Sequence, residues 1–206
     1  MSMKPPWMTP PGARGTKTRR LPEARREELI ERLEGLILAE GFARLTVDDL
    51  AARLACSKST LYAVAASKEQ LVVAAVRRFF RDVTTRVENK AGAIGDPAQR
   101  IAAYLSGLGV ELQRMSPECH ADMVSTPATA EIYAKNSLAA AHWVRESIQD
   151  GVATGGFRAA NAEFVGAAVS LLIDGIQHGE LLDRAGLSSG AAYAELSDLV
   201  LSALAK

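Results

Sequence analysis

A run of hydroxyl and amino side chains lies in the first half of the chain, at Ser57, Lys58, Ser59, Thr60 and Tyr62. Hydroxyl and ammonium groups donate hydrogen bonds to the phosphate oxygens and base edges of nucleic acids. Two short helices that turned these groups outward would bury a set of apolar neighbours, namely Val47, Leu50, Ala51, Leu54, Cys56 and Leu61. Such a pair is typical of a helix-turn-helix, whose second helix enters the major groove of DNA. The spacing therefore predicts a DNA-contacting element.

Capping residues mark where the helices around this element begin. The Thr46 hydroxyl followed by Asp48 and Asp49 predicts a helix N-terminus. The segment 67–70, with sequence SKEQ, predicts a second capping box that begins a longer apolar helix. Ala55 falls in the turn between the two short helices, where a positive φ would cost an alanine about 1 kcal/mol.

The composition of the whole chain favours an all-α fold. Of 206 residues, 48% are hydrophobic but only 5% are aromatic, and β-branched residues do not alternate at period two. Apolar residues recur instead at three- and four-residue spacing. We expect about nine helices, over 22–41, 46–54, 58–63, 67–89, 97–115, 117–124, 127–150, 161–182 and 191–204.

The zero net charge conceals two halves of opposite sign. Residues 1–90 hold 17 basic and 11 acidic side chains, whereas residues 91–206 hold 7 and 13. A basic N-terminal half indicates a polyanionic partner. Glycines and the Asp96-Pro97 pair mark a boundary between the halves. We predict three parts: a flexible basic arm at 1–20, a DNA-binding domain at 21–90 and a regulatory domain for ligand binding and dimerisation at 91–206.

Three motifs resemble the DNA-binding domain of the tetracycline-repressor (TetR) family of bacterial transcriptional regulators. They are LTVDDLA at 45–51, SKSTLY at 57–62 and SKEQL at 67–71, and the similarity extends over about residues 21–80. The resemblance implies a homodimer that binds a palindromic operator on double-stranded DNA, and the two cysteines, which form no C-x-x-C pair, indicate the reducing cytoplasm. It further implies a repressor that is released when a small-molecule effector enters the second domain.

The same match implies individual roles. Lys58 and Ser59 take the positions of base readers. Phosphate contacts are implied for a further set, Thr46, Ser57, Thr60, Tyr62 and Lys68. Thr46 and Ser57 could equally serve as helix caps, and Tyr62 could pack in the core. The segment 63–65, Ala-Val-Ala, replaces an aromatic residue, a histidine and a phenylalanine that are usual in the family, so the phosphate contact often made by that histidine is absent.

The last two long helices have wide apolar stripes, which predict a dimer interface in the form of a four-helix bundle from two chains. Gly175 and Gly179 are spaced to admit a close neighbouring helix. The predicted interface residues are Phe164, Val165, Ala168, Val169, Leu172, Gly175, Ile176, Gly179, Leu196, Leu199 and Val200. Packing within one chain is the alternative interpretation of these stripes.

An effector cavity is expected among the helices over 97–115, 117–124 and 127–150. Aromatic, aliphatic and flexible side chains mix there with a few polar groups, including Asn136, which favours a moderately hydrophobic effector. The candidate residues are Tyr104, Leu108, Leu112, Met115, His120, Met123, Tyr133, His142 and Trp143. An ordinary core would contain the same residue types.

Enzymatic alternatives fit the sequence poorly. The segment 186–190, GLSSG, matches the G-x-S-x-G nucleophile elbow, but a helix is expected before it and no histidine follows it. Cys119 and His120 are adjacent on a helix and therefore point about 100° apart. No nucleotide-binding motif occurs. We therefore predict a protein that is not an enzyme.

The cysteine content and the length of the aliphatic runs exclude further classes of protein. Cys56 and Cys119 form no C-x-x-C pair, so neither a disulfide framework nor a zinc site is expected, and no cofactor is predicted. The longest aliphatic run, 71–76, is far below the roughly 20 residues that span a bilayer, so no membrane association is expected. A helical ligand-binding or adaptor protein that has lost specific DNA binding stays open as the alternative function, because of the 63–65 segment.

Overall fold

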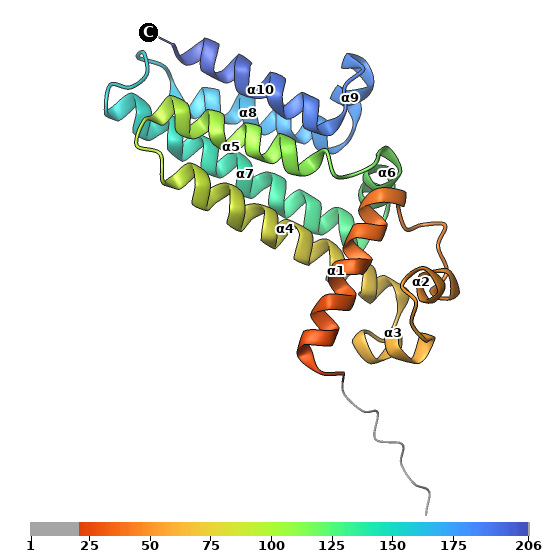
Figure 1. Cartoon of the computed structure of the whole chain (residues 1–206). Helices are drawn as coiled ribbons and strands as arrows, with labels where there is room; N and C mark the ends of the chain where they lie inside the picture. Colours follow the sequence, from red (N-terminus) through yellow and green to blue (C-terminus); the bar gives the residue numbers. More distant parts are fainter. Residues whose placement is uncertain (1–20, 206) are drawn as a thin grey trace, which may run out of the picture.

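The structure is a computed structural model that describes residues 21–205, and this part of the chain forms ten α-helices and no strands (Figure 1). The prediction of an all-α fold is confirmed. The helices are α1 (Glu23–Glu40), α2 (Val47–Arg53), α3 (Lys58–Val64), α4 (Lys68–Gly92), α5 (Pro97–Leu112), α6 (Pro117–Ser125), α7 (Pro127–Ala153), α8 (Ala162–Gln177), α9 (Glu180–Ala185) and α10 (Ser189–Leu204). The basic arm predicted at 1–20 lies outside the described residues.

The single helix predicted over 161–182 is wrong, because the structure divides it into α8 and α9. Gly179 adopts φ 79°, a left-handed conformation that ends α8 and begins α9. The apolar residues Leu181 and Leu182 continue the helical spacing past this point, which concealed the break. The interpretation of Gly179 as a site of close helix approach is corrected accordingly.

The long helices α4, α5, α7, α8 and α10 pack side by side into a bundle (Figure 1). α5 packs against α4, α7 and α10, and α8 packs against α7 and α10. The contact between α5 and α10 is close enough to require glycine, since a Cβ on Gly190 would lie 2.6 Å from the carbonyl oxygen of Gly109. Among the described residues, no helix combines the length and the apolar character that crossing a bilayer would need.

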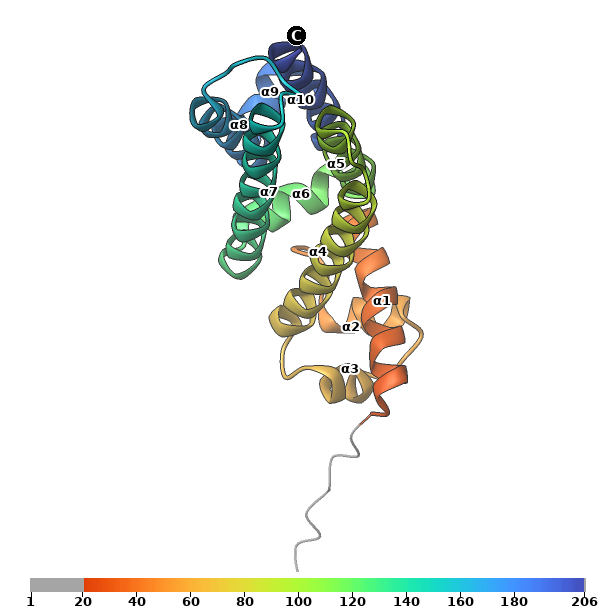
Figure 2. The same ribbon diagram turned by 90° about the vertical axis from the view of Figure 1, so that its left-hand side faces the viewer.

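Helices α1, α2 and α3 form a small unit at one end of the molecule, away from α8, α9 and α10 (Figures 1 and 2). The buried side chains of Leu50 and Leu61 join α2 and α3 to the core. Arg32 on α1 donates a 2.6 Å hydrogen bond to the Leu54 carbonyl at the end of α2. These contacts fix the orientation of α3 on its support.

α4 extends from the N-terminal unit into the bundle and contacts both. It packs against α1 on one side and against α5 and α7 on the other. Two neighbouring residues of α4 contact the bundle: the Phe79 ring lies 5.6 Å from the Arg114 guanidinium, just after α5, and the Phe80 ring lies 5.5 Å from the Tyr133 ring on α7. The small N-terminal unit is therefore joined to the bundle by a continuous helix.

Candidate nucleic-acid interface and ligand cavity

The outward face of α2 and α3 is polar, as the spacing predicted. Lys58, Ser59 and Ser57 are exposed, and Tyr62 keeps 50% of its surface open, which contradicts the core-packing alternative for Tyr62. The apolar side chains that were predicted to face inward are buried or partly buried. Leu50, Ala51, Leu54 and Leu61 are buried, while Val47 and Cys56 are partly buried against the core.

Caps at the start of both helices hold this face in place. The Thr46 hydroxyl accepts a 3.2 Å hydrogen bond from the Asp49 N–H, and Asp49 Oδ2 accepts a 2.8 Å bond from the Thr46 N–H. The Thr46 hydroxyl also donates a 2.7 Å hydrogen bond to Asp49 Oδ2, and this bond, together with the one from the Thr46 N–H, lowers the pKa of Asp49. Ser57 Oγ accepts a 3.1 Å bond from the Thr60 N–H and lies 2.7 Å from Ser59 Oγ. Capping by Thr46 and Ser57 leaves both hydroxyls on the exposed face.

The two lysines of this face have partners of different kinds. Lys58 Nζ lies 2.8 Å from Asp48 Oδ1, and this exposed ion pair raises the pKa of Lys58. Lys68 Nζ donates a 3.1 Å hydrogen bond to the Ala43 carbonyl, which places the ammonium at the N-terminal end of α4. Lys58 is exposed and Lys68 is partly exposed.

The turn between α2 and α3 has the strain expected from the sequence. Ala55 adopts φ 48°, and it is the one non-glycine residue with positive φ among residues 21–205. The residues of the 63–65 segment end α3 and pack against the core as small, partly buried side chains.

Hydrogen bonds tie the N-terminal unit to α6. Asp122 Oδ2 accepts bonds of 2.6 and 2.7 Å from the N–H groups of Phe42 and Ala43 in the loop after α1. The Ser116 N–H donates a 2.8 Å bond to the Leu38 carbonyl on α1. These bonds connect α6 and the residue before it to α1 and to the loop that precedes the helix-turn-helix.

A buried carboxylate makes a second connection. Glu34 on α1 is buried and accepts hydrogen bonds of 2.6 Å from Arg78 on α4 and 3.2 Å from Arg114. Arg114 also bonds Glu111, which pairs with Arg86 through bonds of 2.9 and 2.8 Å. The two arginines lower the pKa of Glu111. The sequence did not predict this network, because the spacing of these charged residues does not indicate that α1, α4 and α5 meet.

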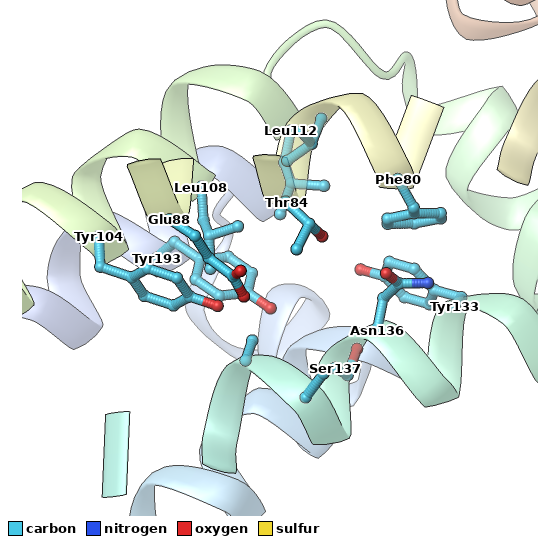
Figure 3. Close-up of a pocket in the computed structure, with 13 residues that line it drawn as sticks. Phe80, Thr84, Glu88, Tyr104, Leu108, Leu112, Tyr133, Asn136, Ser137 and Tyr193 are labelled. Atoms are coloured by element: carbon cyan, nitrogen blue, oxygen red, sulfur yellow. The ribbon is translucent and has the colours of Figure 1, made fainter. Parts of the chain in front are cut away.

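A cavity of about 30 Å³ lies between α4, α5, α7 and α10. Four of the predicted effector residues line it, namely Tyr104, Leu108, Leu112 and Tyr133, together with Asn136. α4 contributes Phe80, Thr84 and Glu88, and α10 contributes Tyr193 (Figure 3). The spacing of 80, 84 and 88 by four residues places them on one face of a helix, a pattern that could have identified them from the sequence.

The other predicted effector residues do not line this cavity. Met115 and Met123 are buried in the core outside it, and His120 lies on α6 with its ring 5.7 Å from that of Tyr133. Trp143 stacks on Tyr104 at 3.9 Å, and His142 is exposed. We expected α5, α6 and α7 to enclose the cavity. The structure shows that α5 and α7 line it together with α4 and α10, and that α6 does not.

The predicted interface residues fall into two groups. Val169, Ile176, Leu196 and Val200 are buried within the chain's own core, so they are corrected to core residues that have little area left for a partner. Phe164 and Leu199 are 72% and 57% exposed. The others, Val165, Ala168, Leu172, Gly175 and Gly179, are partly exposed.

An apolar residue that the prediction omitted adds to this surface. Leu171 on α8 is 74% exposed and lies seven positions after Phe164. Leu171 and Leu138 line a groove of about 620 Å³ between α7 and α8, in which Arg145 and Glu163 supply charges of both signs. Exposed large apolar side chains grouped in this way are typical of an interaction surface.

The residues weighed as catalytic have structural roles. Ser188 in the 186–190 segment caps α10, since its Oγ accepts a 3.3 Å bond from the Ala191 N–H. Cys119 is buried, and burial raises the pKa of its thiol to about 12, which makes it a weak nucleophile at neutral pH. The Asp122 carboxylate accepts hydrogen bonds from the loop after α1.

This arrangement, a helix-turn-helix joined by α4 to a helical bundle with a cavity, is the architecture found in helix-turn-helix transcription regulators. Residues 29–75 match the model of bacterial regulatory proteins of the tetR family. The resemblance found in the sequence is confirmed, and the N-terminal domain is that of a TetR-family regulator. No curated protein sequence matches the chain.

Solved structures share the fold over nearly the whole chain. A TetR transcription regulator from Haloarcula marismortui superposes with a TM-score of 0.70 at 18% identity, covering 89% of this chain and 100% of its own. A transcriptional regulator from Saccharomonospora viridis in complex with choline has a TM-score of 0.71 at 20% identity, covering 90% and 100%. SmeT, the repressor of a Stenotrophomonas maltophilia multidrug efflux pump, has a TM-score of 0.65 at 17% identity, covering 92% of each chain.

Proposed function

We propose that the protein is a homodimeric, ligand-responsive repressor that binds a palindromic operator and is released from it by a small-molecule effector. Its DNA-binding domain comprises residues 21–90 with the arm at 1–20, and its regulatory domain comprises residues 91–206. The observation that carries the proposal is the exposed polar rim of α3, held by caps above a buried apolar face. The protein acts in the bacterial cytoplasm, where operators are accessible.

Within this proposal, Lys58 and Ser59 contact base edges and the other rim residues contact phosphates. Lys58 can exchange its exposed pairing with Asp48 for a base acceptor, because exposed ion pairs are worth little. Thr46, Ser57, Thr60 and Tyr62 present hydroxyls along the same rim. Lys68 adds an ammonium at the positive end of α4, where the helix dipole also favours phosphate.

Effector binding reaches the DNA-binding end through α4 and α6. Phe80, Thr84 and Glu88 line the cavity from α4, while Arg78 on the same helix holds Glu34 of α1. A ligand that separates the cavity walls moves α4 and α7. Because α6 packs against α7, the Asp122 bonds then carry the movement to the loop after α1. The binding energy of the ligand then favours a conformation that fits the operator less well.

A dimer supplies the second half-site contact that a palindrome requires. Phe164 and Leu171 on α8 form the centre of the proposed interface, and Leu199 on α10 extends it. The charges of both signs in the adjacent groove suit a self-complementary contact. We expect sedimentation to give a dimer for the native chain and a monomer for the double variant Phe164→Glu/Leu171→Glu. Val110→Glu, which alters another exposed apolar residue on α5, is the control and stays dimeric.

The choline-bound relative supports a small-molecule site, because the same fold there accommodates a small ligand. For this chain the candidate location is the cavity between α4, α5, α7 and α10. A larger ligand than a water molecule requires those walls to separate, since about 30 Å³ corresponds to one water.

Selection of bound fragments from the source genome, followed by titration of the selected duplex against salt, tests the DNA-binding function. Binding that weakens steeply with salt is expected, and Lys68→Ala flattens the log–log slope by about one unit. Lys58→Ala changes the preferred sequence. If Lys58→Ala weakened every sequence equally, its base-reading role would be wrong. Absence of duplex binding at low salt would favour the adaptor function instead.

A further inference from the structure

The cavity is lined by one ionisable carboxyl group and by no basic side chain. Glu88 is the sole lining residue of the Asp, Glu, Lys, Arg or His types in this cavity. Within residues 21–205 its carboxylate forms neither a hydrogen bond nor an ion pair, although Arg86 and Lys90 are near it in sequence. A half-buried carboxylate without a counter-charge is costly in an apolar setting.

The other polar groups of the cavity are the hydroxyls of its three tyrosines, of Thr84 and of Ser137, each of which can donate or accept a hydrogen bond, and the amide of Asn136. Figure 3 shows the hydroxyl ends of Tyr104, Tyr193 and Tyr133 directed toward a common space, and Glu88 lies close enough to Tyr104 to affect the pKa of its hydroxyl. Asn136 donates its side-chain N–H to the Ile132 carbonyl at 2.8 Å, which leaves its amide oxygen as an acceptor.

The Tyr133 hydroxyl is a buried polar group without a hydrogen-bond partner in the part of the chain described. Ser189 lies near it, but the geometry falls short of a hydrogen bond. Burial raises the pKa of Tyr133 to about 12 and raises the pKa of Tyr193 well above its usual value. Burial and the neighbouring Glu88 raise the pKa of Tyr104. The three tyrosines therefore stay uncharged at neutral pH, and the formal charge of the cavity is that of Glu88.

We propose that the effector is a small organic cation, an amine or ammonium compound whose charged head lies against Glu88 among the tyrosines. The inference rests on the proposed function, because it names the ligand class of the same cavity. An ammonium group supplies the missing counter-charge, donates to the exposed acceptors where it has N–H groups, and is attracted by tyrosine rings. Phe80, Leu108 and Leu112 contact the hydrocarbon part.

Uncharged and anionic ligands fit this cavity less well. A neutral ligand would bury Glu88 further without a counter-charge, and an anion would be repelled by it. A cation gains from burial of the same carboxylate, because water no longer screens the pair. The cation also enters beside α4, the helix that contacts α1.

Calorimetric titration of the full-length protein with charged and uncharged isosteres tests the ligand class. The probes are choline against 3,3-dimethylbutan-1-ol, and benzylamine against benzyl alcohol. We expect at least one cation to bind about tenfold or more tightly than its neutral counterpart. Glu88→Gln is expected to reduce that preference to about twofold or less, whereas Glu88→Asp keeps it. Glu131→Gln, which removes an exposed carboxylate from α7, is the control and leaves the preference unchanged.

Three results would overturn the inference: equal or tighter binding of the neutral isosteres, a preference that survives in Glu88→Gln, or no binding of any cation at millimolar concentration. Circular dichroism verifies that each variant folds. Duplex binding is measured separately. Duplex binding without cation binding contradicts the ligand class alone, whereas cation binding without duplex binding contradicts the proposed function alone.

Discussion

The Asp122 carboxylate on α6 accepts a 2.6 Å hydrogen bond from the backbone N–H of Phe42, at the entrance to the helix-turn-helix. The two residues are 80 positions apart in the sequence. The same oxygen accepts from the N–H of Ala43. One side chain thus fixes the loop that precedes α2 to α6.

Replacing Asp122 by alanine leaves two N–H groups without their acceptor. We expect the free energy of unfolding to fall by about 1–3 kcal/mol, which is the usual cost of a partly buried group that loses its partner. Effector-induced loss of operator affinity should also decrease, because α6 no longer restrains the loop. Urea denaturation and operator titrations with and without effector measure the two effects. Glu131→Ala is the control, and an Asp122→Ala protein of native stability would refute the role.

Glu34 is the buried partner of two arginines, so its removal leaves cationic groups poorly compensated. Glu34→Leu should destabilise the protein by about 3 kcal/mol, as is usual when one member of a buried pair is removed. Arg78 retains more distant contacts with Glu31 and Asp82 at 3.6 Å, which limits the loss.

Urea denaturation also measures this effect. The matched control is Glu180→Ala, which breaks the exposed pair with Arg184. It should change stability by less than about 1 kcal/mol. Equal effects of the two substitutions would show that the buried carboxylate contributes no more than a surface one.

Asp48 forms an ion pair with Lys58, the residue that we propose as a base reader, so under that proposal Asp48 competes with DNA. Asp48→Asn removes a negative charge from the polar rim and frees the ammonium, so affinity for duplex should increase about two- to fivefold at low salt. Fluorescence anisotropy with a labelled operator measures the change. The double variant Asp48→Asn/Lys58→Ala should lose most of this gain, and a gain of the same size in the double variant would show that Lys58 is not involved.

Ala55 adopts a left-handed backbone conformation that glycine tolerates better. Ala55→Gly should therefore stabilise the protein by up to about 1 kcal/mol. Ala52→Gly, three residues earlier in α2, should instead destabilise it by about 1 kcal/mol, since glycine is a poor helix former. Thermal and urea unfolding compare the two, and the same sign for both would contradict the strain at Ala55.

Burial lowers the pKa of His120, with an opposing contribution from the Gln177 carbonyl. The unfolded chain then binds the proton more readily than the folded chain, so this contribution to stability is lost as pH falls below about 6.5. Unfolding free energies between pH 8 and pH 5.5 should show the decline. It should lessen in His120→Gln and persist in His178→Gln, whose side chain is exposed. An unchanged decline in His120→Gln would assign it to other groups.

Local sequence features predicted the helices well because they depend on neighbouring residues. Thr46, Ser67, Asp96 and Asn161 all cap the helices expected of them. The apolar face of the helix-turn-helix was predicted from spacing for the same reason. The break at Gly179 was missed, because a glycine inside an apolar repeat does not reveal its φ.

The cavity and the burial of the α8 and α10 stripes were harder to predict, since both depend on which helix faces meet. Tyr104 and Tyr133 were predicted to line the cavity. Glu88 and Tyr193 were not, because their helices were expected in the DNA-binding domain and in the dimer interface. Trp143 was expected in the cavity and instead stacks on Tyr104. Ile176 and Leu196 belong to apolar stripes whose burial within one chain is decided by the packing of α8 and α10. A stripe alone does not distinguish a core from an interface.

The continuity of α4 makes it a lever arm. Lys68 and Glu88 lie on one uninterrupted helix of 25 residues, and the rise of 1.5 Å per residue separates them by about 30 Å. A tilt of about 5° at the cavity end thus displaces the other end by about 2.6 Å. In a symmetric pair the two displacements add, so two α3 helices that fit grooves about 34 Å apart would fall out of register with the duplex. A ligand of only a few atoms would in this way weaken contacts that extend over many base pairs.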